Sequence, residues 1–332
     1  MQLAGGAAVT GSKVLTDMKN AVKLNGYLIS VVVPHLNQPK ELAACLSSLQ
    51  NQDLEPSFYE IIVVDNGSAE LPLDIVASYR NARLMTEAQP GPGPARNTGI
   101  RAAQGRFIAF LDADCRAHPA WLSTALHVLS AAPENTVLGG DVRIWRAAEG
   151  GFTGLEAYES VFGYRAKLYV ERHGYCPTGN LAAPRSAFKS IGPFGGIQFA
   201  EDMEWGERAR RAGFQLRYVP DMIVFHPART STQALFAKWD RHSQHYFNMI
   251  KGKPAWRTRW VMRALLIAAS PAVDLAKVIK SDRLYGLTAR LKAIGILFRI
   301  RLYRAWAMIS LLRSSGPVKW NRGPTHADPP AA

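Results

Sequence analysis

The stretch Arg106-Phe-Ile-Ala-Phe-Leu-Asp-Ala-Asp114 decides the fold of this 332-residue chain. Its run of apolar residues is typical of a strand that is covered on both faces, as in the parallel sheets of α/β proteins. Two earlier stretches have the same texture, Leu28-Ile-Ser-Val-Val-Val33 and Tyr59-Glu-Ile-Ile-Val-Val64. Between them, apolar residues recur at helical spacing from Leu42 to Leu49, so the chain predicts a strand-helix-strand unit.

Each of these predicted strands ends in polar residues. Asp65 follows the second strand, and Asp112 and Asp114 follow the third. The carboxyl ends of parallel strands form the usual ligand crevice of an α/β sheet, so we expect these carboxylates to face one crevice. Two carboxylates in an Asp-Ala-Asp sequence can hold one divalent ion, and oxygen ligands favour Mg²⁺ or Mn²⁺. A solvated acidic turn is the alternative interpretation.

The later part of the chain predicts shorter elements and then long helices. Before residue 234 we expect a helix over 119–131, a strand over 136–144, a Gly-rich connection over 149–163, a helix over 201–212, and short strands over 216–219 and 222–225. The predicted organisation is a loose lead-in over 1–26, an α/β domain over 27–233, a helical extension over 234–320 and a disordered tail over 321–332.

The net charge of +14 is concentrated near the C-terminus. Residues 251–320 hold 15 Lys and Arg residues against two acids, whereas the rest of the chain holds 25 basic and 24 acidic residues. An amphipathic helix there suits an anionic membrane surface, and a solvated helix surface is the alternative. Nucleic-acid binding lacks a recognised module. The predicted apolar face comprises Leu287, Leu291, Ile294, Leu297, Phe298, Arg301, Leu302, Ala305, Trp306 and Ile309, bordered by Arg290, Arg299, Arg304 and Arg313.

Three further absences in the sequence narrow the class of protein. No stretch reaches the roughly 18 uncharged apolar residues of a confident membrane-spanning helix. The first 26 residues lack the continuous apolar region of a secretory signal. Cys45, Cys115 and Cys176 lie far apart, without a CxxC pair, which argues against structural zinc and a disulfide framework and fits a reducing compartment.

Six motifs in order resemble the family 2 glycosyltransferases. They are VVVPHLN (31–37), VVDNGS (63–68), ARNTGIRAAQGRFIAFLDAD (95–114), TGN (178–180), AEDMEWGERARRAG (200–213) and a strand-end His226. The resemblance covers roughly residues 27–230. It implies a GT-A fold, which is a Rossmann-like mixed α/β sheet flanked by helices, and a nucleotide-sugar donor.

The resemblance also implies roles for individual residues. The donor-binding set would be Pro34, Asn37, Asp65, Arg96, Asp112 and Asp114, and the acceptor side would include Thr178, Gly179 and Asn180. Asp114 and His226 would hold the metal ion, Mn²⁺ or Mg²⁺. Plain structural roles are the alternatives for three of them: a helix cap for Asn37, a pair with a surface acid for Arg96 and a core imidazole for His226.

Two acids compete for the role of general base. Glu201 and Asp202 begin a predicted helix, where capping and the helix dipole also favour carboxylates. Inversion requires one ionised carboxylate that accepts the proton of the acceptor hydroxyl. By resemblance to the family's ED motif, we assign the base to Asp202, with Glu201 as the second choice.

The sequence-based hypothesis is therefore an inverting, single-addition transferase. It would move a sugar from a nucleoside-diphosphate donor, with UDP as the family-level expectation, to a membrane-linked glycan or polysaccharide acceptor, as a peripheral protein on the cytoplasmic side of the membrane. Lys238-Trp239 stands without the QxxRW signature of processive synthases. The rival hypotheses are a nucleotidyltransferase and a catalytically silent nucleotide-sugar-binding protein.

Overall fold

The computed structural model describes residues 26–146, 150–196 and 200–313. The chain forms two compact units. The first comprises the residues up to 143 together with 165–226, and the second comprises 144–164 together with the residues from 227 onward. The predicted lead-in and tail lie almost entirely outside the described residues.

The first unit is built on an eight-stranded mixed sheet in the order β3-β2-β1-β4-β7-β6-β8-β5. Strands β1 to β4 run parallel, and β7 pairs antiparallel with β4. The strands are β1 (Ile29–His35), β2 (Tyr59–Asp65), β3 (Ala82–Thr86), β4 (Phe107–Leu111), β5 (Arg116–Ala117), β6 (Thr136–Trp145), β7 (Asn180–Pro184) and β8 (Gln215–Pro227). The three strands predicted from apolar runs are β1, β2 and β4, and each is buried on both faces, as predicted.

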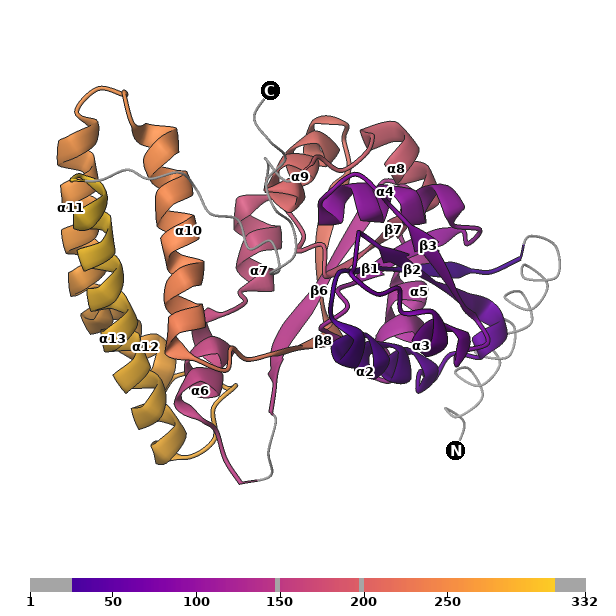
Figure 1. The fold of residues 1–332 in the computed structure, drawn as a ribbon, viewed down its shortest axis with the longest axis horizontal. Coiled ribbons are helices and arrows are strands. Elements are labelled where there is room, and N and C mark those ends of the chain that lie inside the picture. The colour runs from indigo at the N-terminus through magenta and orange to yellow at the C-terminus, as the bar shows by residue number, and fades with distance from the viewer. Residues whose placement is uncertain (1–25, 147–149, 197–199, 314–332) are drawn as a thin grey trace, which may run out of the picture. The chain divides into compact units, whose positions relative to one another are not determined.

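Helices cover both faces of this sheet (Figure 1). One core contains side chains from α2, α3 and α5, and the opposite core contains side chains from α4, α8 and α9. The first set is α2 (Pro39–Gln50), α3 (Leu73–Ala77) and α5 (Trp121–Ala131), and the second is α4 (Pro92–Ala102), α8 (Arg185–Ile191) and α9 (Glu201–Arg211). Short helical turns complete the unit: η1 (Pro56–Phe58), α7 (Ala166–Leu168) and η2 (Tyr169–His173).

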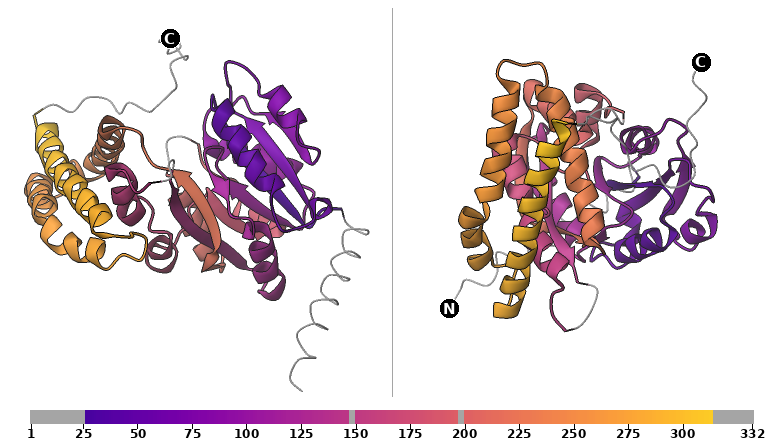
Figure 2. Two further views of the ribbon diagram at one scale, coloured as in Figure 1. Left: turned by 90° about the horizontal axis from the view of Figure 1, so that it is seen from below. Right: turned by 60° about the vertical axis from the view of Figure 1, so that its left-hand side comes forward.

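The second unit is helical, and Figure 2 shows its longer helices side by side. Its helices are α6 (Gly154–Phe162), α10 (Thr232–Ile250), α11 (Trp256–Ala269), α12 (Pro271–Ile279) and α13 (Leu287–Leu311). Ala157, Tyr158 and Phe162 of α6 pack in one core with Leu297 and Ile300 of α13. Over the described residues, none of the helices is long and apolar enough to cross a membrane.

Two sequence-based expectations about these elements were wrong. The Gly-rich connection over 149–163 contains helix α6, whose capping box joins Thr153 and Glu156 in both directions. The predicted break between two short strands does not occur, because β8 runs continuously through Pro220. Its pairing with β5 begins only at Val224, so Pro220 lies beyond it, where the missing N–H costs no ladder bond on that side.

Helix α13 has apolar residues on more than one face, and the apolar face predicted from the sequence mixed buried residues with exposed ones. Leu297 was predicted to lie on the exposed face, but it is 0% exposed in the core beneath α6. The large apolar residues of α13 that are exposed are Leu287, Leu291, Phe298, Leu302 and Trp306, the last of which is 65% exposed. Helix α13 therefore has an exposed apolar face, but its residues differ from those of the predicted face.

Candidate active site

The carboxyl end of β2 carries a buried carboxylate that is fully engaged by the protein. Oδ2 of Asp65 lies 2.9 Å from Nδ1 of His35, and Oδ1 accepts from the N–H groups of Gly67 and Ser68 at 3.0 and 2.9 Å. Burial alone would raise the pKa of Asp65, but the hydrogen bonds from Ser68, His35 and Gly67 outweigh it and lower the pKa. Nε2 of His35 accepts from the N–H of Gln38 at 3.2 Å, so Nδ1 carries the proton donated to Asp65.

This engagement gives Asp65 a structural role. The residue is 1% exposed, and both of its carboxylate oxygens are engaged within the protein. Asp65 thereby organises the turn after β2 and holds His35 at the end of β1, and its contact with the donor base stays a prediction. His35 was quoted in the first motif but assigned no role.

Asn37 ties the end of β1 to the same turn. Its backbone is left-handed, with φ of 51°, and its N–H donates to Oγ of Ser68 at 2.8 Å. Its Oδ1 accepts from the N–H of Ala69 at 2.9 Å, so the alternative of a helix cap was wrong. Pro34 stands one residue before the end of β1 and is half-buried. The nucleoside-binding roles of Pro34 and Asn37 stay predictions.

Arg96 of α4 joins two acids that are distant in sequence. Its guanidinium is buried, with one terminal nitrogen 2.7 Å from Oδ1 of Asp112 and the other 3.0 Å from Oε1 of Glu201. Burial alone would lower the pKa of Arg96, but the charges of Asp112 and Glu201 raise it. Arg96 is therefore a buried bridge between two more exposed acids, at the end of β4 and the start of α9. Its donor-binding role stays a prediction.

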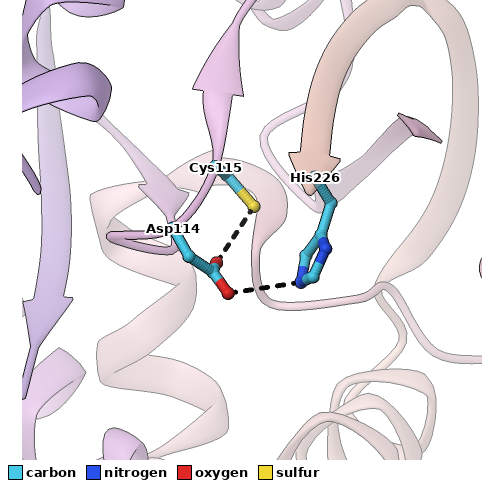
Figure 3. Close-up of side chains that lie close together, drawn as sticks. All are labelled: Asp114, Cys115 and His226. Carbon is cyan, nitrogen blue, oxygen red and sulfur yellow. Dashed lines mark hydrogen bonds and ion pairs between the residues drawn. The ribbon is translucent and has the colours of Figure 1, made fainter. Parts of the chain in front are cut away.

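Asp114 and His226 meet because a two-residue strand brings them together. Two residues after Asp114, β5 begins and pairs with the end of β8, with Arg116 opposite Phe225. Nε2 of His226 then lies 3.4 Å from Oδ2 of Asp114, as Figure 3 shows. Burial raises the pKa of Asp114; His226 opposes this rise, and Asp112 adds to it.

The side chains around Asp114 fit a divalent ion. Ligand atoms of Asp114, Cys115 and His226 all lie within 4.8 Å of one another. The carboxylate and imidazole suit Mn²⁺ or Mg²⁺ in the presence of further oxygen ligands. Cys115 donates weakly to Oδ1 of Asp114 at 3.5 Å, and burial raises the pKa of its thiol well above the ordinary value. Cys115 therefore stands as a neutral neighbour, which sequence reasoning did not single out.

The two acids at the start of α9 have different surroundings. Glu201 is paired with Arg96, whereas Asp202 accepts a hydrogen bond from the N–H of Met203 at 2.8 Å. Burial, followed by the charge of Glu201, raises the pKa of Asp202 to about 6. A carboxylate of this pKa is ionised at neutral pH and basic enough to accept a proton, which are the requirements for a general base.

The Thr178-Gly-Asn180 motif packs against Asp112 and the core of the first unit. A Cβ added to Gly179 would lie 2.5 Å from Oδ2 of Asp112, so only glycine permits this approach. Asn180 was predicted to lie on the acceptor side, but it is 0% exposed. Its side chain bonds the carbonyls of Asp141 and Met222 and the indole of Trp121, so it is a core residue. Thr178 is also buried.

One aromatic group near Asp202 was not anticipated. The ring of Tyr175 stacks on that of Tyr169, with centroids 5.2 Å apart. Burial raises the pKa of Tyr175, and the charges of Tyr169 and Asp202 add to the rise. Gly206 of α9 lets the helix approach, because a Cβ there would lie 2.6 Å from Cβ of Tyr175. The segment carries no motif that could have located this contact.

Comparisons with known proteins agree with this architecture. The sequence model of Glycosyl transferase family 2 matches residues 30–191. Glycosyltransferase AglE of Haloferax volcanii is 33% identical over 207 residues, which cover 60% of this chain and 67% of that protein. The poly(ribitol-phosphate) β-N-acetylglucosaminyltransferase TarS of Staphylococcus aureus is 38% identical over 90 residues, which cover 26% of this chain but only 16% of its own length.

Two solved structures share the fold. The mannosyltransferase PcManGT of Pyrobaculum calidifontis, solved with GDP-Man and Mn²⁺, gives a TM-score of 0.56 at 19% identity and covers 92% of this chain and 96% of its own. TarS 1-349 with UDP-GlcNAc gives 0.50 at 17% identity and covers 86% of this chain and 91% of its own. The GT-A fold is confirmed, and the chain belongs to glycosyl transferase family 2 and is a glycosyltransferase.

Proposed function

We propose that this glycosyltransferase moves one sugar from a nucleoside-diphosphate donor to a glycan or lipid-linked acceptor, with inversion at the anomeric carbon. The observation that carries the proposal is the bridge from Asp112 through Arg96 to Glu201. The bridge joins the end of β4, where Asp114 and His226 lie, to the start of α9, where Asp202 adjoins Glu201 and is suited to act as a base. One base and one metal-binding pair are the groups that direct displacement needs.

The chain's own residues divide the work between donor and acceptor. Asp202 accepts the proton of the acceptor hydroxyl as that oxygen attacks the anomeric carbon. A divalent ion bound by Asp114 and His226 would supply positive charge for the departing diphosphate. Asp112 contacts the ribose and diphosphate side of the donor, and Arg96 keeps its carboxylate oriented.

The identity of the donor base is the finer part of this proposal. UDP is the family-level expectation, and one of the similar structures holds UDP-GlcNAc while another holds GDP-Man. Thermal-shift measurements with UDP, GDP, CDP and dTDP in the presence of Mn²⁺ discriminate among them. The nucleotide that gives the largest rise in melting temperature identifies the donor class.

Product analysis tests the reaction itself. We expect release of a nucleoside diphosphate and, by proton NMR of fresh product, an anomeric configuration opposite to that of the donor. A retained configuration contradicts the single-base mechanism. Release of pyrophosphate from a nucleoside triphosphate favours the nucleotidyltransferase hypothesis, and donor binding without turnover by any acceptor favours the silent binding protein. Products with a single added sugar support the non-processive assignment.

We further propose that the second unit docks on an anionic membrane surface, as a peripheral association on the cytoplasmic side. Exposed apolar side chains occur on α11, α12 and α13, and they include Leu265, Leu266, Phe298, Leu302 and Trp306. Cations such as Arg259 and Arg299 are exposed on the same helices. Apolar side chains beside basic ones suit insertion among anionic headgroups, where each Lys or Arg contributes about 1 kcal/mol.

A further inference from the structure

The second unit contains a group of basic side chains around Trp239, which we call the basic cluster. Its histidine, His242, is neutral near pH 7, because burial and the charges of Lys238, Arg241, Arg304 and Arg229 lower its pKa to about 4. It consists of Lys238, Arg241 and His242 of α10, Arg304 of α13, and Arg229 in the segment between β8 and α10. His242 is exposed and the other four residues are partly exposed, so a solute can reach the cluster. None of them has a role in the proposed glycosyl transfer.

The ring of Trp239 contacts several side chains of the basic cluster. The guanidinium carbon of Arg304 lies 3.6 Å from the centroid of the Trp239 ring, and the His242 ring lies 5.6 Å from it. Nε of Arg304 is buried and has no hydrogen-bond partner among the described residues. Nζ of Lys238 lies 5.9 Å from the Trp239 ring and 5.5 Å from that of Tyr164. Aromatic faces hold these cations, but they do not neutralise them.

One acid of this unit neutralises a member of the basic cluster, and two others have partners outside it. Glu159 is buried and accepts two hydrogen bonds from Arg229, one of them from its backbone N–H at 2.7 Å. Asp240 accepts from the hydroxyl of Tyr303 at 2.8 Å. Asp274 is shared by Lys277 and Arg301, at 2.6 and 2.7 Å. Among the described residues, no carboxylate forms an ion pair with Lys238 or Arg304.

The titration of the cluster agrees with this excess of positive charge. Burial, followed by the charge of Arg229, lowers the pKa of Lys238 to about 8. Burial, followed by the charge of Arg301, lowers the pKa of Arg304 to about 10. Glu159 compensates Arg229, whereas Lys238 and Arg304 are partly buried without an ion pair among the described residues, which is costly unless an anion compensates them. The free protein therefore holds a site that an anion would stabilise.

We propose that the basic cluster binds a phosphate group of the acceptor, a phosphate monoester or a diphosphate that joins a glycan to a lipid. Guanidinium and ammonium groups gathered around the Trp239 ring suit a multiply charged oxyanion. The donor diphosphate is not the ligand, because the metal-binding pair and Asp112 serve it in the first unit. Binding of phosphate is independent of catalysis, whereas its assignment to the acceptor rests on the proposed function.

Calorimetry with farnesyl phosphate tests the binding, with farnesol as the uncharged control. We expect Lys238→Met and Arg304→Gln each to weaken the affinity for farnesyl phosphate by about 10-fold or more, because each removes a charge-assisted contact. Lys189→Met is the matched control, since it removes an exposed cation of α8 in the first unit, and it should leave the affinity unchanged. Equal affinity in all four proteins, or equal binding of farnesol, overturns the proposal.

Thermal unfolding distinguishes a binding role from a purely structural one. Without phosphate, Lys238→Met should raise the melting temperature, because it removes an uncompensated charge while preserving side-chain length. With inorganic pyrophosphate, the wild-type melting temperature should rise and that of Lys238→Met should not. A Lys238→Met protein that melts lower than wild type and responds equally to pyrophosphate contradicts the proposal.

Two further measurements distinguish an acceptor phosphate from a membrane headgroup, and phosphate binding from glycosyl transfer. Flotation with phosphatidylglycerol vesicles should be the same for wild type and Lys238→Met; a loss of flotation with farnesyl phosphate binding intact would assign the cluster to membrane headgroups and overturn the acceptor proposal. Nucleotide binding in the first unit should be unchanged by Lys238→Met. If the protein transfers no sugar but its phosphate binding still depends on Lys238, the assignment to the acceptor is refuted. The anion-binding site itself would remain supported.

Discussion

Oε1 of Glu201 lies 3.0 Å from a guanidinium nitrogen of Arg96, and this ion pair distinguishes the two acids at the start of α9. The same arginine holds Asp112, so Arg96 joins Glu201 to the end of β4. Asp202 makes no ion pair within the described part of the chain, and its raised pKa suits proton transfer. The geometry therefore supports Asp202 as the base and Glu201 as a residue that positions Arg96.

The first prediction separates these two roles. Asp202→Asn should lower turnover by about 100-fold or more and leave donor affinity nearly intact, because it removes the proton acceptor. Glu201→Gln should mainly weaken donor binding, through the loss of its ion pair with Arg96. Initial rates and donor calorimetry of both variants provide the check. The reverse pattern would transfer the base assignment to Glu201.

The second prediction concerns pH. Only the ionised form of Asp202 can accept a proton, so kcat/KM should fall about tenfold per pH unit below about pH 6. The charge of Glu201 is one cause of the raised pKa, so Glu201→Gln should shift this acid limb to lower pH. The pH profiles of the two proteins give the answer. An acid limb at the same pH in both would show that Glu201 does not act on the titrating group.

The third prediction concerns the metal ion. Asp114→Asn and His226→Ala should each weaken Mn²⁺-dependent binding of a nucleoside diphosphate, and a chelator should abolish the metal-dependent part. Cys115→Ser is the matched control from the same cluster. It should have little effect, because Mn²⁺ and Mg²⁺ prefer oxygen ligands to a buried neutral thiol. Calorimetry in which Asp114→Asn binds as tightly as wild type would remove the metal from the proposal.

The fourth prediction tests the close approach of Gly179, the residue before β7, to Asp112. Gly179→Ala places a Cβ 2.5 Å from the present position of Oδ2 of Asp112, so that carboxylate must move. Donor affinity should fall as a result. Gly295→Ala, on α13, meets nothing within 4 Å and serves as the control; it should leave donor binding unchanged. Equal donor affinity in Gly179→Ala and wild type would mean that the position of Asp112 does not matter for binding.

The fifth prediction concerns the membrane. Full-length protein should float with anionic vesicles, and high salt should weaken this binding without abolishing it, because salt screens only the charged contribution. A double change of Phe298 and Trp306 to Ser should weaken flotation at any salt concentration, since both are exposed. A double change of Leu71 and Leu73 to Ser, exposed residues of the first unit, is the control. Equal flotation of both variants would leave the docking surface unsupported.

Much of the first unit could be predicted from local pattern. Strands β1, β2 and β4 were readable because each is an almost unbroken apolar run, which is the signature of a strand buried on both faces. The two-residue strand β5 and the five-residue strand β3 carry no such pattern, so they were missed. Helix α6 had a readable capping box at Thr153 and Glu156, but the surrounding glycines obscured it.

The order of the motifs in the sequence likewise indicated the family. The spacing of residues within each motif identified the acids at the strand ends, because residues close in sequence lie on the same loop. Tertiary structure alone decided which of those groups meet. Asp114 reaches His226 only through the register of β5 against β8, and Arg96 reaches Glu201 only because α9 packs on the same face of the sheet as α4. Such contacts join residues far apart in the chain, and a shift of one residue in strand register would turn every side chain to the opposite face. For the same reason, sequence could count the cations of the second unit, but only the packing of α10 with α13 placed Arg304 on Trp239 and Leu297 in the core.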